Sequence, residues 1–333
     1  MKLIKSHFVL LCVILMLSIR DVSAHAPDIP SENESLETAY TISDPAKSWA
    51  IYAELHEGAE AQYYKFDLPQ NERLLVMLFV PTSEQSSFVP NLVIMGPGIT
   101  SQEALPEYVE AVEGDGIMLL EAERPLKPAY EPFTPSSYYY LATFDQEIST
   151  AGTHYIAVYE PFQGGRYGLA VGYREEFGID EFIKIPVDVV GIHLWEGQSV
   201  LLIFAPLLVT LAIGLVVLFL KRPLTFRTLF GLLGILAGLL YLGSGVMIIT
   251  QMIAALTTAT IDSSIVLTVI FALMPILLGI AILRLTGREK DVTNRLRVYI
   301  AIAGAAGLFV WAGLLIGPAL ALLASLVPAK RVW

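Results

Sequence analysis

The pattern of apolar and polar positions changes character near Trp195. Beyond it lie four long apolar runs, at about 200–220, 229–250, 265–283 and 298–327. A helix needs about 20 mostly apolar residues to cross the hydrocarbon core of a bilayer, so these runs predict four transmembrane helices. The fourth run contains Gly317-Pro318, where a proline kinks a helix or lets it turn along the membrane interface. Residues 328–333 form a short tail.

The part before Trp195 has the pattern of short strands. Segments such as Tyr64-Lys65-Phe66-Asp67-Leu68 alternate apolar and polar residues, and Gly, Pro, Asn and Ser separate them. This pattern predicts a β-sandwich over residues 49–182, preceded by an extended lead-in at 25–48. Four prolines make Arg124–Ser137 a long ordered loop.

The connection between the two halves, residues 183–198, is predicted to be a juxtamembrane linker. Pro186 should interrupt any long helix there, because proline lacks a backbone donor. Trp195 is expected in the outer headgroup layer, where amphipathic aromatic rings anchor.

The first 24 residues are typical of a signal peptide. Lys2 and Lys5 precede an apolar stretch at 8–19, and Ala24 ends a small-residue cleavage site. The loops at 221–227 and 284–297 carry eight basic residues, which favours the cytoplasmic side. The expected protein is a multi-pass plasma-membrane protein: an extracytoplasmic antiparallel β-sandwich, jelly-roll-like, followed by a four-helix transmembrane bundle.

Two segments of the predicted sandwich carry a family resemblance. Residues 63–69 (YYKFDLP) with 72–76 (ERLLV), and 152–158 (GTHYIAV) with 165–171 (GRYGLAV), resemble strands of the pre-peptidase C-terminal (PPC) domain. That resemblance implies a jelly-roll-like accessory domain that binds or targets rather than catalyses. The whole architecture also resembles an uncharacterised family of archaeal and bacterial membrane proteins, which implies no particular activity.

Charge and cysteine content narrow the function classes. Residues 25–195 hold 27 acidic and 8 basic residues, a net charge of −19, so the predicted sandwich would be repelled by nucleic acid. The only cysteine, Cys12, lies in the predicted signal peptide, which excludes thiol catalysis and thiolate metal sites in the mature chain. The four apolar runs contain no Asp, Glu, Lys, Arg or His, which argues against a proton-coupled transporter.

Histidines offer a candidate metal site. Cleavage after Ala24 would leave His25 at the amino terminus, where its α-amino and ring nitrogens could chelate copper. His56 and His154 are the candidate partners, because imidazole suits copper and zinc. Solvated or structural histidines are the competing interpretation.

The sequence holds no recognised catalytic constellation: Gly-x-Ser-x-Gly and His-Glu-x-x-His are both absent. We therefore expect a non-enzymatic, membrane-tethered module that binds an extracytoplasmic ligand or partner. Two alternatives stay open. One is a copper- or zinc-handling protein that uses His25; the other is an accessory subunit of a larger membrane complex. The expected partners are the lipid bilayer and a membrane protein or a second copy of the chain.

Overall fold

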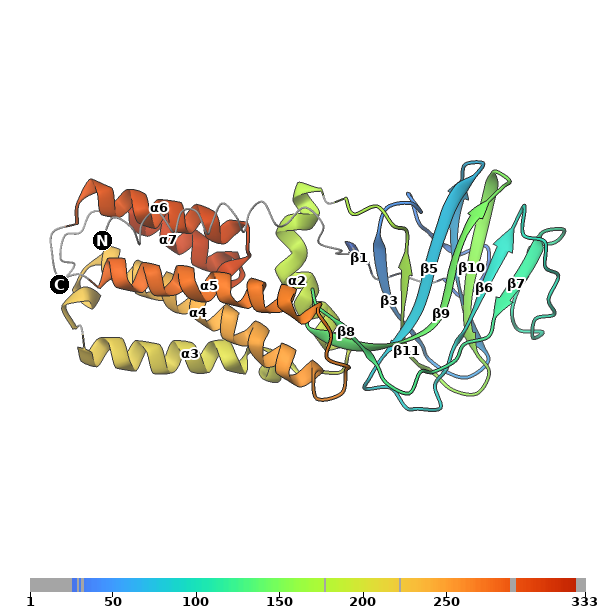
Figure 1. Ribbon diagram of the computed structural model, residues 1–333, viewed down its shortest axis with the longest axis horizontal. Helices are drawn as coiled ribbons and strands as arrows, with labels where there is room; N and C mark the ends of the chain where they lie inside the picture. The colour runs from blue at the N-terminus through green and yellow to red at the C-terminus, as the bar shows by residue number, and fades with distance from the viewer. Residues whose placement is uncertain are drawn as a thin grey trace.

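The computed structural model describes residues 26–28, 30, 33–176, 178–221, 223–287 and 292–327. Its β-rich part precedes its helical part (Figure 1). The predicted signal peptide, His25 and the tail at 328–333 lie outside the described residues.

Two curled sheets stack face to face in the manner of a β-sandwich. Between the described strands, all pairs are antiparallel except β1–β3 and β2–β4. The six-stranded sheet has, in spatial order, β1 (Ala26–Asp28), β3 (Trp49–Leu55), β11 (Gly165–Val171), β5 (Glu72–Pro81), β9 (Ser136–Ile148) and β8 (Ala129–Glu131). The five-stranded sheet has β2 (Tyr40–Thr41), β4 (Glu60–Leu68), β10 (Gly152–Glu160), β6 (Asn91–Gly96) and β7 (Gly116–Leu120).

Strand β5 illustrates how the alternation of the sequence builds the core. Leu74, Val76 and Leu78 are fully buried between the two sheets. Successive side chains of a strand point to opposite faces, so Met77 and Phe79 point outward. They are nevertheless packed in a second apolar cluster with Ile192 and Trp195, because a helix covers this outer face.

That helix is α2 (Ile179–Trp195), which replaces most of the linker predicted at 183–198. The prediction that Pro186 interrupts a long helix was wrong: Pro186 lies inside α2. Proline leaves the carbonyl oxygen four residues earlier, that of Phe182, without its helical donor. Here the indole Nε1 of Trp311 donates to that oxygen at 2.8 Å. A contact from a distant segment therefore satisfies the group that the proline frees.

Among the residues that the structure describes, three helices are long and apolar enough to cross a membrane: α3 (Val200–Lys221), α4 (Leu229–Ala255) and α5 (Ile265–Thr286). A short helical turn, η2 (Pro223–Arg227), joins α3 to α4. The fourth predicted run forms a bent pair, α6 (Asn294–Leu308) and α7 (Ile316–Leu326), with an angle of 115° between them and the turn η3 (Ala312–Leu315) at the break. Counting that pair as one span gives up to four.

The bend corrects the expectation for the fourth run. The bend lies at Trp311–Leu315, before Gly317-Pro318. Pro318 is in the first turn of α7, where the backbone N–H groups have no acceptor within the helix, so the N–H that proline lacks is not missed. Helix α7 runs back along α6, as Figure 1 shows. The Arg297 guanidinium, near the start of α6, donates to the carbonyl oxygens of Ser325 and Val327 at the end of α7. The pair is a hairpin rather than one continuous helix.

The layers follow one another along the long axis of the molecule: the helix bundle, then α2, the six-stranded sheet and the five-stranded sheet (Figure 1). The strands run across this axis. Helix α2 is therefore the layer between the sandwich and the bundle.

Candidate functional site

His154 has a structural environment. It is fully buried, its Nδ1 lies 3.0 Å from the carbonyl oxygen of Gly152, and its Nε2 lies 2.9 Å from that of Pro97. The ring stacks on Phe66, with centroids 6.2 Å apart. Gly96 leaves room for it, since a Cβ there would lie 2.3 Å from the ring. Both ring nitrogens thus face carbonyl oxygens of the fold, and neither is turned to an open site.

The structure does not bring His56 and His154 together. Along the β4–β10 pair, Glu60 is opposite Glu160 and Phe66 is opposite His154. His56 precedes Glu60, so six strand positions, roughly 20 Å, separate the two histidines. Ala26 pairs with Trp49 at the start of β3, whereas His56 follows the end of that strand. His25 itself lies outside the described residues, and the copper site stays a prediction.

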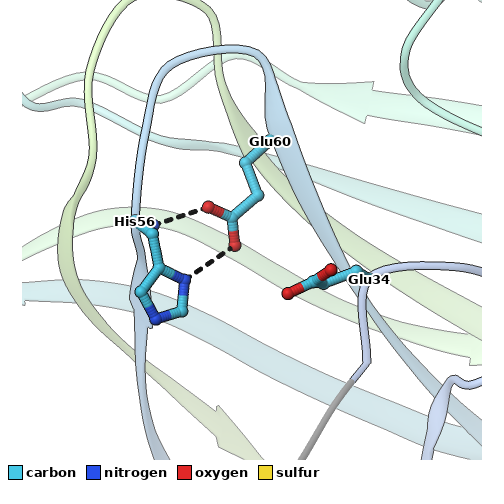
Figure 2. Close-up of side chains that lie close together, drawn as sticks. All are labelled: Glu34, His56 and Glu60. Carbon is cyan, nitrogen blue, oxygen red and sulfur yellow. Dashed lines mark hydrogen bonds and ion pairs between the residues drawn. The ribbon is translucent and has the colours of Figure 1, made fainter.

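His56 instead lies beside two carboxylates at the β3–β4 turn (Figure 2). One ligand atom from each of Glu34, His56 and Glu60 lies within 4.8 Å of the others. Nδ1 of His56 is 3.4 Å from Oε1 of Glu60. Two ligands about 2.05 Å from a tetrahedral zinc ion lie roughly 3.3 Å apart, so this spacing is compatible with zinc.

The two carboxylates are held differently. The backbone N–H groups of His56 and Glu57 donate to Oε2 of Glu60, at 2.6 and 3.2 Å, so this carboxylate is fixed by its own turn. Glu34 is exposed and is positioned by its neighbour Asn33. The Asn33 amide donates to the Tyr63 carbonyl oxygen at 3.2 Å, and the Tyr63 N–H donates to the Asn33 carbonyl oxygen at 2.7 Å.

Sequence reasoning singled out His56 but did not predict that Glu60 or Glu34 lies beside it. Glu60 follows His56 by four residues across a tight turn. This spacing can be read from the sequence, but it is not specific, because glutamates are common in so acidic a segment. Glu34 comes from the lead-in, and only the pairing of Asn33 with Tyr63 brings it near the turn. No local pattern in the sequence indicates that pairing.

A second group of polar side chains joins the sandwich to the helices. The Tyr138 hydroxyl of β9 donates to Oε1 of Glu196 at 2.7 Å, and Nδ1 of His193 lies 2.9 Å from Oε2 of the same carboxylate. The amides of Gln198 and Gln251 then donate to each other, at 3.0 and 2.9 Å. This chain of contacts, which we call the junction network, runs from β9 through the end of α2 to α4.

Trp195 also belongs to this junction. Its ring packs edge-on against Tyr52 at 4.9 Å, and its Nε1 donates to the carbonyl oxygen of Ala53 at 3.0 Å. The Arg166 guanidinium donates to the Trp195 carbonyl oxygen at 2.7 Å. The sequence predicted a lipid anchor at Trp195, whereas its ring contacts the outer face of the six-stranded sheet.

The β8–β9 hairpin makes a separate attachment to the bundle. The Tyr130 hydroxyl donates to Oγ1 of Thr268 in α5 at 2.7 Å, and Thr268 donates to the Pro132 carbonyl oxygen at 2.6 Å. The hydroxyls of Ser137 and Thr258 lie 2.9 Å apart. The segment predicted as a long ordered loop therefore carries an edge strand, β8, and docks on the α4–α5 connection.

Two acidic side chains line a cavity of about 30 Å³ between α2 and the six-stranded sheet: Glu131 and Asp188. Burial raises the pKa of Glu131 to about 7; the Phe133 N–H, which donates to its carboxylate at 3.0 Å, acts in the opposite direction. Burial also raises the pKa of Asp188, and Lys184 opposes it. These two carboxyl groups hold protons more readily than exposed ones.

A larger cavity, about 100 Å³, lies on the bundle side of α2. Its lining comes from α2, the β8–β9 hairpin, α4, α5 and the bend between α6 and α7. We call it the junction cavity. Trp311 packs there against Phe182, Phe133 and Phe271, with ring centroids 4.7, 6.1 and 6.3 Å away.

The bend beside the junction cavity has an unusual backbone. Trp311, Leu314 and Leu315 adopt left-handed conformations, with φ of 46°, 56° and 66°. Side chains of this size rarely adopt them, at a cost of roughly 1 kcal/mol or more each, and such residues concentrate at functional sites.

Comparison with known proteins adds no family to these observations. The chain matches no protein-family model, that of the PPC domain included, and no curated protein matches it significantly. The resemblance to PPC domains therefore rests on the two pairs of strand segments alone.

Proposed function

We propose that the protein is a membrane-tethered, non-enzymatic module whose β-sandwich binds an extracytoplasmic ligand or partner. The observation that carries this proposal is the attachment of the sandwich to the helices. Helix α2, the junction network and the β8–β9 hairpin join the two parts through buried contacts. A module attached at several points keeps one orientation, so its outer surface is presented in a defined direction.

The orientation relative to the membrane belongs to the same proposal. Lys221 and Arg227, and on the other connection Arg284 and Arg297, lie at the end of the bundle away from the sandwich. Basic loops favour the cytoplasmic side, so the sandwich would lie outside. A net charge of −19 over residues 25–195 suits a cationic or basic ligand.

Site-specific photocrosslinking tests which surface meets the partner. A photoreactive benzoylphenylalanine would replace Leu126 or Phe162 on the sandwich, where both side chains are strongly exposed. Matched positions on the bundle are Ile213 and Leu220, which are exposed on α3. We expect protein or ligand adducts from the sandwich positions in native membranes.

The result also separates the module from an accessory subunit. If only the Ile213 and Leu220 positions gave adducts to a protein, the proposal would be contradicted. That result would favour the accessory subunit, because in a subunit of that kind the helix bundle contacts the partner protein. Turnover of a substrate by the purified full-length chain would contradict the non-enzymatic part.

Metal handling is the second candidate, favoured by the Glu34–His56–Glu60 group. Zinc titration of the full-length protein should show one site per chain, weakened at least about 10-fold by His56→Gln or Glu34→Gln. Glu57→Gln is the control, since Glu57 is exposed on the same turn and outside the group. Unchanged affinity in both test variants would remove this candidate.

The copper site predicted at His25 needs a different test. One added residue ahead of His25 would separate the α-amino group from the ring and should abolish tight copper binding there. The same addition would leave zinc binding at the β3–β4 turn unchanged, so the two metal hypotheses can fail separately.

A further inference from the structure

The junction cavity contains one buried titratable ring, that of His193. This residue is 2% exposed and lines the cavity on the same face of α2 as Ile185 and Val189. Its Nδ1 is paired with Glu196 at 2.9 Å. Within the described part of the chain, no hydrogen bond reaches its Nε2. Nδ1 is therefore committed to the junction network, and Nε2 is the ring atom available to an occupant.

The partner of Nδ1 decides what Nε2 can do. With the proton of a neutral His193 placed on Nδ1, this nitrogen donates to the carboxylate of Glu196, which only accepts when it is ionised. In a neutral imidazole the other nitrogen is then an acceptor. Glu196 is itself held by the Tyr138 hydroxyl at 2.7 Å, which fixes its carboxylate. The complementary group on a ligand is a hydrogen-bond donor, such as a hydroxyl.

The other residues that line the cavity indicate the chemistry of the rest of the ligand. Phe133, Phe271 and Trp311 contribute aromatic rings, and Met247 and Leu314 add apolar surface. The other polar side chains of the lining already have partners: Ser244 bonds to Tyr241 and Gly313, Thr268 to Tyr130 and Pro132, and Gln251 to Gln198. Aromatic walls favour a flat ring in stacked or edge-on contact.

The volume of the cavity matches a ligand of one ring. The cavity measures about 100 Å³. A closed apolar cavity of roughly 150 Å³ holds benzene, so a six-membered ring fits this smaller, partly open space with small shifts of the walls. The left-handed residues Trp311 and Leu314 line it, which places the strained backbone at the cavity.

We propose that the junction cavity binds a small monocyclic aromatic alcohol, of the phenol class, whose hydroxyl donates to Nε2 of His193. The ring lies among Phe133, Phe271 and Trp311. Because the cavity is lined by α2, by the hairpin of the sandwich and by three segments of the bundle, the ligand contacts both halves of the molecule at once. This site is independent of any partner that the sandwich surface binds.

The test uses two probes and two variants of the full-length protein in lipid nanodiscs. The probes are 4-bromophenol and bromobenzene, which differ in the hydroxyl. Ile248→Phe narrows the cavity, because Ile248 lines it; Val246→Phe is the matched control, because Val246 is exposed on the same helix. Calorimetric titration, corrected with empty nanodiscs, measures saturable binding.

We expect one 4-bromophenol per wild-type chain, and bromobenzene weaker by about 2- to 10-fold, the value of one neutral hydrogen bond. Val246→Phe should bind like the wild type, and Ile248→Phe should lose the saturable site. The proposal is overturned by the absence of saturable binding in the wild type, by equal binding to Ile248→Phe, or by equal affinity for the two probes. If Ile248→Phe fails to fold, the comparison of the two probes on the wild type still decides.

Discussion

Glu131 makes the stability of the protein depend on pH. Its folded-state pKa is about 7, above the value of roughly 4.3 for an unperturbed glutamate. The folded state therefore holds this proton more tightly than the unfolded chain does. The stabilisation is fully present below about pH 4 and is lost as the pH rises through about 7.

The change that tests this is Glu131→Gln. Between pH 5 and pH 8 the wild type should lose on the order of 1–2 kcal/mol of unfolding free energy. This value is smaller than the full pKa shift would give, because solvent screens the partly exposed side chain. Glu131→Gln keeps the acceptor for the Phe133 N–H and should flatten that slope, although Asp188 contributes in the same direction. Thermal melts at several pH values measure it, with the exposed Glu123→Gln as control. A slope that stays unchanged in Glu131→Gln would exclude Glu131 as its source.

Glu60 should stabilise the β3–β4 turn whether or not a metal binds there. Its carboxylate accepts two backbone N–H groups, at 2.6 and 3.2 Å, in a turn where Ala59 has a left-handed φ of 63°. Replacing it with alanine should cost about 1–3 kcal/mol, the value of hydrogen bonds to a charged group. Denaturant unfolding at constant pH measures this, and Glu57→Ala on the same turn should change stability by less than about 0.5 kcal/mol.

At the scale of single residues, spacing in the sequence could have predicted one pair of neighbouring side chains but not the other. His193 and Glu196 are three residues apart, which places them on one face of a helix. That pair could have been found from the sequence if the segment had been assigned as helix. Glu34 could not, because the Asn33–Tyr63 pairing that positions it joins residues 30 apart in the sequence.

At the scale of elements, small residues decide how the helices pack. Gly234 and Gly238 of α4 lie against Thr286, Leu283 and Gly279 of α5, so this pair of glycines serves packing within the chain. Gly307 and Gly317 instead leave room for Tyr241, whose hydroxyl donates to the carbonyl oxygen of Ala303 at 3.2 Å. The α6–α7 hairpin closes around that tyrosine.

Two glycine-to-alanine changes should have opposite effects. In Gly307→Ala the new Cβ would lie 1.8 Å from the Tyr241 hydroxyl oxygen, which should cost about 1–3 kcal/mol. In Gly191→Ala the new Cβ meets no atom of the described residues within 4 Å, and the helix α2 should gain about 0.5–1 kcal/mol. Thermal unfolding in one detergent compares them. Tyr241→Phe should restore part of the loss in the double variant; strict additivity would contradict the contact.

The elements that the sequence predicted best are those with a repeated pattern. The strands from Trp49 to Val171 follow from alternation, and three apolar helices follow from run length. The predictions failed where a contact from a distant part of the chain, or an unusual backbone conformation, overrides the local sequence pattern. Trp311 satisfies the carbonyl that Pro186 frees, so α2 continues. Left-handed residues also bend the fourth run, and of these, Trp311, Gly313, Leu314 and Leu315, only the glycine favours that conformation.

At the scale of the whole molecule, the bend decides at which end of the bundle Leu326 lies. A single fourth span would carry residue 326 to the side of the sandwich. The α6–α7 hairpin instead returns Leu326 to the end of the bundle that holds the start of α6, as the bonds from Arg297 to Ser325 and Val327 require. This end also carries Lys221 at the end of α3. Membrane sidedness of Leu326 therefore distinguishes a hairpin from a crossing helix.

Thiol labelling of single-cysteine variants in intact cells reads that sidedness. The only native cysteine, Cys12, would be replaced by serine. Leu126→Cys, Lys221→Cys and Leu326→Cys introduce thiols at exposed positions on the sandwich and at the far end of the bundle. A membrane-impermeant maleimide should label Leu126→Cys in intact cells, and the other two only after permeabilisation. Labelling of Leu326→Cys together with Leu126→Cys would mean that the last segment crosses the membrane, because a hairpin cannot carry that residue to the sandwich side.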